Sequence, residues 1–245
     1  MNSNSSSTHA VHFLVELRSR LIYSLIFLFF IFSVLLYFAN NLYSWLALPL
    51  LKFLPQGHLI ATQIVSPFFV PFKLAFLAAM VMAMPFFLYQ TWAFVAPALY
   101  GHERRLLWPF LFTSAILFYC GMAFAYFVIF PALFHFLAGV APQGVMLSPD
   151  IGEYLDFTSK LLLMFGCLFE IPIVMVLLVS AGMVTRARFV KMRSYAIVGA
   201  FIIGMLLAPP DVLSQTMLAV PIWLLYESGV LFARLVEKKQ HEQEK

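Results

Sequence analysis

Long runs of uncharged, apolar residues recur along this chain, and they constrain its fold more than any other feature. The first run, residues 21–38, contains no charged side chain over 18 residues. A helix of about 20 apolar residues crosses the hydrocarbon core of a bilayer. Over the whole chain 63% of the 245 residues are hydrophobic and 11% are charged, which is too little charge to cover a water-soluble globule. The sequence therefore predicts an all-α integral membrane protein and excludes large extramembrane domains.

The apolar runs predict six transmembrane helices, four of full length and two short. The full-length helices are expected at residues 21–38, 69–95, 106–130 and 153–181, and the short ones at residues 195–208 and 212–232. A 14-residue helix reaches only about 21 Å, whereas the hydrocarbon core is about 30 Å thick. Pro131 is expected to end the third helix.

Segments at the two ends of the chain differ from the apolar core. Residues 11–20 have apolar side chains at helical spacing and charged ones on the other faces, which predicts an interfacial amphipathic helix before the first span. The domain organisation expected is a disordered tail at residues 1–10, a membrane domain at residues 11–235 and a polar cytoplasmic tail at residues 236–245.

The positions of the cationic residues predict the topology. Alternate connections and the two termini hold two, two, four and four of them, which is 12 of the 15 in the chain. Cytoplasmic loops are enriched in Lys and Arg, so we expect both termini to be cytoplasmic, as six spans require. The 12 residues are Arg18, Arg20, Arg104, Arg105, Arg186, Arg188, Lys191, Arg193, Arg234, Lys238, Lys239 and Lys245.

Two carboxylates, Glu16 and Glu103, lie among these basic residues on the predicted cytoplasmic face. One interpretation is that each forms a local ion pair with a neighbouring arginine and anchors the interface. The other is that they form an anionic clamp for a ligand with two guanidinium groups, because arginine pairs with carboxylates in a bidentate geometry. The sequence leaves both interpretations open.

Polar side chains inside the predicted spans are the second group of candidates. Glu170 is surrounded by apolar residues in the middle of the fourth predicted helix, where a carboxylate is costly and suggests a function. The alternative is a neutral Glu170 that hydrogen-bonds a neighbouring helix or backbone released by Pro172. Gln215, near the start of the last helix, is a weaker case of the same kind.

Small residues recur every fourth position on two of the predicted helices. Such stripes let helix backbones approach closely. On the fifth helix the stripe could pack against the sixth helix or could bind the single helix of a partner; on the second helix internal packing is the expected use. The stripes are Ala196, Ala200, Gly204 and Ala208, and Ala75, Ala79 and Ala83.

Catalytic and metal-binding motifs are missing from the sequence. The six histidines and two cysteines are scattered without ligand spacing, so no metal and no cofactor is expected. No GxSxG or Walker glycine loop is present, and the chain is predicted not to be an enzyme. The basic residues form clusters between apolar runs, which suits membrane topology and not nucleic-acid binding.

Several sequence segments together resemble the TatC family, the multi-spanning subunit of the twin-arginine protein translocase. They cover nearly the whole chain in order, and the loop that ends in Glu-Arg-Arg is quite specific. One departure is the stretch Pro67-Phe68-Phe69, where many members carry a glutamate. The matching segments are residues 13–20, 66–69, 89–100, 103–105, 169–172 and 209–215.

The resemblance implies a receptor and core subunit of a Sec-independent translocase in the bacterial cytoplasmic (inner) membrane. Such a protein binds the paired-arginine signal peptides of folded cargo at the cytoplasmic face and assembles with single-span TatB-like and TatA-like proteins, as a homo-oligomer within a complex, for export driven by the proton-motive force. The positions that match the recognition surface are Glu16, Glu103, Arg18 and Phe94.

The resemblance also implies roles for residues away from the recognition surface. Glu170 matches the mid-membrane polar site, and the short fifth and sixth helices would bind the partners. Further sensitive positions are Pro49, Asp211 and Gln215, and the partner-helix interface comprises Ala196, Ala200, Gly204, Met205 and Gln215.

Two other functions remain as alternatives. A proton-coupled secondary transporter or channel would use Glu170 as an intramembrane relay, although no inverted repeat or second buried charge supports it. A purely structural scaffold would use Glu170 for packing alone.

Overall fold

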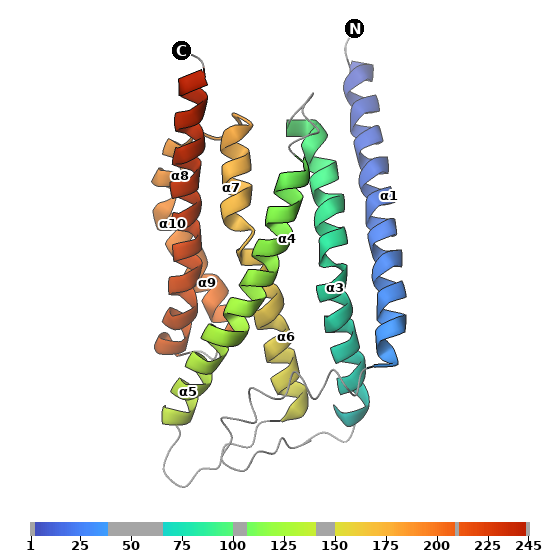
Figure 1. Ribbon diagram of the computed structural model, residues 1–245, viewed down its shortest axis with the longest axis vertical. Coiled ribbons are helices and arrows are strands. Elements are labelled where there is room, and N and C mark those ends of the chain that lie inside the picture. Colours follow the sequence, from blue (N-terminus) through green and yellow to red (C-terminus); the bar gives the residue numbers. More distant parts are fainter. Residues whose placement is uncertain (1–2, 39–65, 100–106, 141–149, 209–210, 244–245) are drawn as a thin grey trace. The chain divides into compact units, whose positions relative to one another are not determined.

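The structure, a computed structural model, describes residues 3–38, 66–99, 107–140, 150–208 and 211–243 (Figure 1). Helices account for nearly all of these residues, as the apolar runs predict. The elements are α1 (Ser3–Leu36), α3 (Ser66–Leu99), α4 (Leu107–Phe124), a π-helical segment (Ala125–Ile129), α5 (Phe130–Val140), α6 (Ile151–Leu168), α7 (Ile171–Ser180), α8 (Arg186–Lys191), α9 (Arg193–Leu207) and α10 (Val212–Gln243).

Five helical stretches within these ranges are long and apolar enough to cross a membrane. They are Leu14–Leu36, Phe68–Phe94, Trp108–Phe136, Ile151–Ser180 and Val212–Glu237. The remaining apolar helix, α9, has 15 residues, which reach about 22 Å. The all-α membrane fold is therefore confirmed, with five candidate spans and one shorter apolar helix.

The chain divides into two compact units. One contains α1, α3 and the start of α4 up to Ala115, and the other contains the chain from Ile116 onward. In the second unit α10 packs against both α7 and α9. A glycine permits one close approach: a Cβ atom at Gly229 of α10 would lie 2.6 Å from the sulfur of Met175 of α7.

The prediction that Pro131 ends the third helix is wrong. The helix continues from α4 through the π-helical segment into α5 and ends at Val140. A proline in a regular α-helix collides with the carbonyl group four residues earlier. The π segment widens the helix directly before Pro131, since the N–H of Phe130 donates to the carbonyl oxygen of Ala125, five residues back. The helix therefore passes the proline without ending.

The fourth predicted helix is not continuous. Helix α6 ends at Leu168 and α7 begins at Ile171, so Glu170 lies at a junction and not in the middle of a helix. Pro172, in the first turn of α7, has no N–H to extend the hydrogen-bond ladder of α6. The N–H of Glu170 instead donates to the carbonyl oxygen of Cys167, at 3.1 Å.

The last helix is longer than the sequence predicts. Its apolar part runs from Val212 to Glu237, 26 residues, which is long enough to cross a bilayer. The prediction placed this helix at residues 212–232 and treated it as short because Gln215 and Glu227 interrupt its apolar residues. The charge of Glu227 is compensated by an ion pair with Arg193 of α9. Of the two helices predicted to be short, only α9 is.

At the N-terminal end, α1 is one helix from Ser3 to Leu36. It joins the predicted surface segment, residues 11–20, directly to the first span. The helix also begins within residues 1–10, which the sequence assigns to a tail; that assignment and the other domain boundaries stay predictions.

Candidate functional site

Glu16 and Arg20 form an ion pair one helical turn apart on α1. Residues at positions i and i+4 are neighbours on a helix surface, so the two side chains meet without any distortion of the backbone. Both Nε and Nη2 of Arg20 donate to Oε1 of Glu16, at 3.0 and 2.7 Å. The side chains are 25% exposed for Arg20 and 37% exposed for Glu16. Solvent therefore reaches both partners.

The same guanidinium group ties α1 to α3. Nη1 of Arg20 donates to Oε1 of Gln90 at 3.1 Å, and Nη2 donates to the carbonyl oxygen of Ala93 at 3.3 Å. A carboxylate, a side-chain amide and a backbone carbonyl thus surround one planar cation. We call these acceptors, from Glu16, Gln90 and Ala93, the guanidinium site. Its geometry suits arginine because the donors of a guanidinium lie in one plane and point in fixed directions.

Close packing of α1 on α3 holds the guanidinium site in place. Leu28 of α1 packs against Ala79 and Ala83 of α3, and all three are buried. The rings of Phe27 and Phe86 lie 4.4 Å apart nearby. The prediction that the alanine stripe of the second span serves internal packing is confirmed.

An open groove lies between α1 and α3 beside the guanidinium site. Its volume is about 530 Å³, and its lining is aromatic and aliphatic except for Gln90, which also binds Arg20. The lining residues are Tyr23, Ile26, Phe27, Phe30, Phe86 and Gln90.

The structure brings some of the predicted recognition residues together. Glu16 is part of the guanidinium site, Phe94 follows Ala93 on α3 and is half-buried, and Arg18 is exposed on α1. Glu103 and Pro49 lie outside the described residues, so the convergence of Glu16 with Glu103 stays a prediction. The local ion pair expected as one interpretation of Glu16 is present, and its partner is Arg20.

Sequence reasoning missed Arg20 and Gln90 as parts of a site. The spacing of Glu16 and Arg20 is a signal that could have found the ion pair. No sequence pattern links either of them to Gln90, because the contact depends on how α1 and α3 pack.

In the second unit Glu170 is half-buried at the junction of α6 and α7. Its carboxylate makes no capping hydrogen bond to the first turn of α7, whereas its backbone carbonyl oxygen accepts from the N–H of Val174 at 3.0 Å. The junction places an acidic residue where a membrane-spanning stretch changes from one helix to the next.

Polar contacts join α9 to α10. The amide Nε2 of Gln215 donates to the carbonyl oxygen of Phe201 at 2.9 Å, and Arg193 pairs with Glu227. Asp211 caps α10, because its Oδ2 accepts from the N–H of Ser214 at 2.7 Å.

The small-residue stripe of α9 faces α10 for part of its length. Ala200 and Gly204 are buried, and a Cβ atom at Gly204 would lie 3.0 Å from the backbone oxygen of Gln215. Ala196 is half-buried, and Met205 is 56% exposed. Of the residues predicted to bind a partner helix, Met205 is thus the most accessible.

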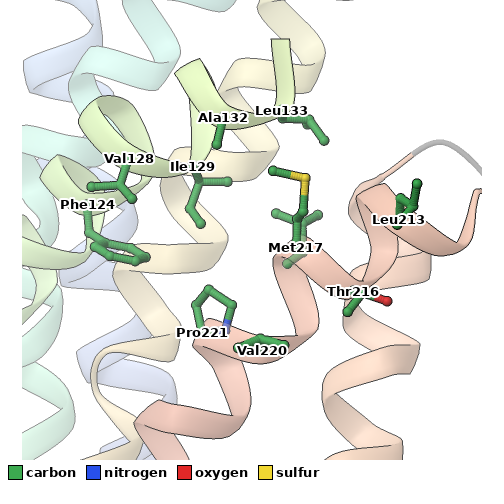
Figure 2. A pocket seen from close by; sticks show the side chains of 11 residues that line it. Phe124, Val128, Ile129, Ala132, Leu133, Leu213, Thr216, Met217, Val220 and Pro221 are labelled. Carbon is green, nitrogen blue, oxygen red and sulfur yellow. The ribbon is translucent and has the colours of Figure 1, made fainter. Parts of the chain in front are cut away.

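A second groove, of about 400 Å³, lies between α10 and the stretch from Phe124 to Leu133 (Figure 2). Met217 and Pro221 of α10 line it opposite Ile129 and Ala132. Thr216 contributes the one hydroxyl group, which donates to the carbonyl oxygen of Val212. The lining offers apolar contact and no charge.

No metal centre is built from the described part of the chain: nowhere in it do three His, Cys, Asp or Glu side chains lie close enough to hold an ion.

Comparisons with known proteins agree on one family. The family described as "Sec-independent protein translocase protein (TatC)" matches residues 12–221. The protein of that name from Escherichia coli (strain K12) is 51% identical over 232 residues, which are 94% of this chain and 90% of the relative. The one from Haemophilus influenzae is 48% identical over 243 residues, 99% of this chain and 95% of the relative.

The fold agrees with the same family. A solved structure described as "Crystal Structure of Twin Arginine Translocase Receptor- TatC" superposes with a TM-score of 0.84 at 38% sequence identity. The match covers 92% of this chain and 99% of that chain.

Proposed function

Because this chain belongs to the TatC family of Sec-independent protein translocase proteins, we propose that it is the receptor subunit of a twin-arginine translocase. It binds the paired-arginine signal peptides of folded cargo. Its role is transport and not catalysis, as the names of its relatives indicate. The observation that carries the proposal is the guanidinium site, where Glu16 already accepts two hydrogen bonds from an arginine.

The recognition surface in this proposal combines Glu16 with Glu103, and Arg18 and Phe94 lie beside them. A carboxylate that is partly exposed at a membrane surface attracts a cationic peptide and pairs with a guanidinium group in a defined geometry. Phe94 supports this arrangement, because it follows Ala93, an acceptor of the guanidinium site, on α3.

The topology in this proposal has six spans with both termini in the cytoplasm of a bacterium, and α9 is the short fifth crossing. A 15-residue helix spans less than the hydrocarbon core, so the bilayer must thin beside α9. The segment at residues 11–20 lies at the cytoplasmic surface, and the terminal segments 1–10 and 236–245 lie outside the membrane domain. The membrane is the cytoplasmic (inner) membrane.

Partner proteins in this proposal are single-span TatB-like and TatA-like subunits that bind at α9 and α10. The exposure of Met205 supports this location, and Gln215 provides a polar side chain at the junction of the two helices. Several copies of the chain assemble in the complex. The proton-motive force drives export, and the apolar part of the signal peptide passes close to Glu170.

Charge reversal tests the recognition surface. Glu16→Arg and Glu103→Arg should each abolish site-specific crosslinking of a signal peptide in membrane vesicles, and the matched control Glu153→Arg should not, because Glu153 is an exposed carboxylate at the start of α6. A signal peptide whose arginines are replaced by aspartate should fail to crosslink to the unaltered protein. Undiminished crosslinking in both tests would show that neither carboxylate binds the peptide.

The transporter alternative makes a different prediction. The break between α6 and α7 is an observation in its favour, since discontinuous helices bind ions and substrates in transporters. Proteoliposomes that contain the isolated chain should show no solute or proton uptake if it is a receptor. Uptake that is lost in Glu170→Gln would establish the transporter instead. A scaffold, in contrast, predicts that Glu170→Ala leaves export unchanged.

A further inference from the structure

The guanidinium site is a complete binding site that one of the chain's own residues fills. Arg20 donates from Nε, Nη1 and Nη2, and these atoms reach acceptors on two helices. Those acceptors are Glu16 on α1 and Gln90 and Ala93 on α3. An ion pair within one helix would require only Glu16, so the two acceptors on α3 define a site that is larger than the pair.

We propose that an arginine of the signal peptide binds in this same site by displacing Arg20, so that Gln90 and the carbonyl group of Ala93 help to select arginine. This inference rests on the proposed function, because it specifies where and how the paired-arginine peptide binds. Arg20 is then an internal competitor that occupies the site in the absence of cargo. Gln90 is a specificity-determining residue.

The acceptor geometry explains a preference for arginine over lysine. Three nitrogen atoms of one planar group contact the carboxylate, the amide oxygen and the backbone carbonyl at distances of 2.7 to 3.3 Å. Lysine carries its charge on a single nitrogen atom and cannot reach acceptors on both helices in this way. A lysine in the peptide would therefore pair with Glu16 alone.

The exposure of the pair makes the exchange feasible. The Arg20 side chain is 25% exposed and that of Glu16 is 37% exposed, so an incoming peptide can reach them. Exposed ion pairs at i,i+4 spacing contribute little free energy, and the released Arg20 regains hydration. One guanidinium replaces another, so the polar groups of the site stay satisfied.

The groove between α1 and α3 fits the rest of such a ligand. Gln90 belongs both to the guanidinium site and to the groove lining, so the two features are continuous. The lining beyond Gln90 is apolar and includes Tyr23, Phe27, Phe30 and Phe86. An arginine followed by an apolar segment would contact the acceptors with its guanidinium group and the aromatic rings with its apolar part.

Equilibrium binding to the full-length protein in lipid nanodiscs tests the displacement. The probe is a fluorescent peptide with two arginines followed by an apolar stretch, measured by anisotropy against the same peptide with two lysines. Arg20→Lys keeps the positive charge but removes the internal guanidinium. Displacement predicts that this variant binds the arginine peptide several-fold more tightly than the unaltered protein, whereas the lysine peptide gains less. Equal or weaker binding of the arginine peptide would overturn the proposal.

A second set of variants tests Gln90. In the Arg20→Lys background, Gln90→Leu should weaken binding of the arginine peptide about ten-fold, the effect of losing one charge-assisted hydrogen bond. Gln90→Glu should restore or increase the affinity because it supplies a charged acceptor, and this recovery also excludes misfolding as the cause of the loss. The matched control is Thr91→Ala, an exposed neighbour on α3 whose hydroxyl donates to the backbone of Phe87, and it should leave binding unchanged. No effect of either Gln90 variant would exclude Gln90 from the site.

The outcomes separate this inference from the proposed function. If Glu16→Gln weakens binding of the arginine peptide but the Arg20 and Gln90 variants behave like the controls, the receptor function stands and the displacement is wrong. If Glu16→Gln has no effect and the two peptides bind equally, the receptor function itself fails.

Discussion

The close contact between α4 and α6 makes Gly121 a sharp test of the packing in the second unit. A Cβ atom at this position would lie 2.5 Å from the backbone oxygen of Phe165 and 2.8 Å from Cγ of Phe169. The first distance is 0.9 Å short of the 3.4 Å at which ordinary contact begins. Since the oxygen belongs to the backbone of α6, no side-chain rotation relieves the overlap, and the two helices must separate.

The magnitude follows from two opposing effects of Gly121→Ala. Alanine favours an α-helix over glycine by about 1 kcal/mol, and overpacking of a buried contact costs about 1–3 kcal/mol. Gly199→Ala in α9 is the matched control, because nothing lies within 4 Å of its added Cβ atom. Gly199→Ala should gain the stability that alanine adds to a helix, without the steric overlap. The two variants should therefore differ in unfolding free energy by about 1–3 kcal/mol, with Gly199→Ala the more stable.

Heat treatment in detergent, followed by fluorescence-detected size-exclusion chromatography, ranks the variants by the temperature at which half of the monodisperse protein is lost. We expect the order Gly199→Ala, unaltered protein, Gly121→Ala, from most to least stable. A Gly121→Ala protein as stable as Gly199→Ala would refute the close backbone approach of α4 and α6.

Other predictions use the same heat assay. Ala79→Leu should lower the unfolding free energy by about 1–3 kcal/mol, because Ala79 is fully buried against Leu28 and a larger side chain pushes α1 away from α3. Unchanged stability would contradict the close packing of α1 on α3. Arg193→Gln and Glu227→Gln should each destabilise the protein, and the double variant should lose less than the two losses combined, since the residues form one ion pair; strict additivity would mean that the pair contributes nothing. Asp150→Ala should lower the unfolding free energy by about 1 kcal/mol, and Asp150→Asn should lower it less, because Asp150 accepts hydrogen bonds from two backbone N–H groups in the first turn of α6. Equal losses for the two variants would argue against a capping role of Asp150.

The membrane fold could be predicted from the sequence because lipid imposes a simple rule on it. A crossing helix needs a long apolar run, and the runs that begin near residues 21, 69, 106 and 153 each correspond to a stretch long and apolar enough to cross a membrane. The predicted helix boundaries are wrong where a rule for a single residue was applied without considering the residues around it. Pro131 does not end a helix because a π segment precedes it, and the fourth predicted helix is interrupted at Glu170 because Pro172 lacks the N–H that would continue the hydrogen-bond ladder.

The candidate site was predictable only in part, for a physical reason. Glu16 is conspicuous as an acidic residue among arginines, and its spacing to Arg20 lies within one helix. Gln90 is 70 positions away from Arg20 along the chain, and nothing in its own surroundings marks it as a ligand. Arg20 contacts Gln90 because the alanine stripe brings α3 close to α1. Which residues of the two helices then lie opposite each other depends on the packing of both helices along their whole length.

The most direct measurement of the central claim is the affinity of the purified chain, alone in nanodiscs, for a paired-arginine peptide and for its paired-lysine counterpart. A receptor with a carboxylate at its recognition surface should bind the arginine peptide at least about ten-fold more tightly, the factor for one charge-assisted hydrogen bond. Glu16→Gln should weaken the binding of both peptides, because both pair with this carboxylate. Equal affinities for the two peptides in the unaltered protein would contradict the claim that this chain recognises paired arginines.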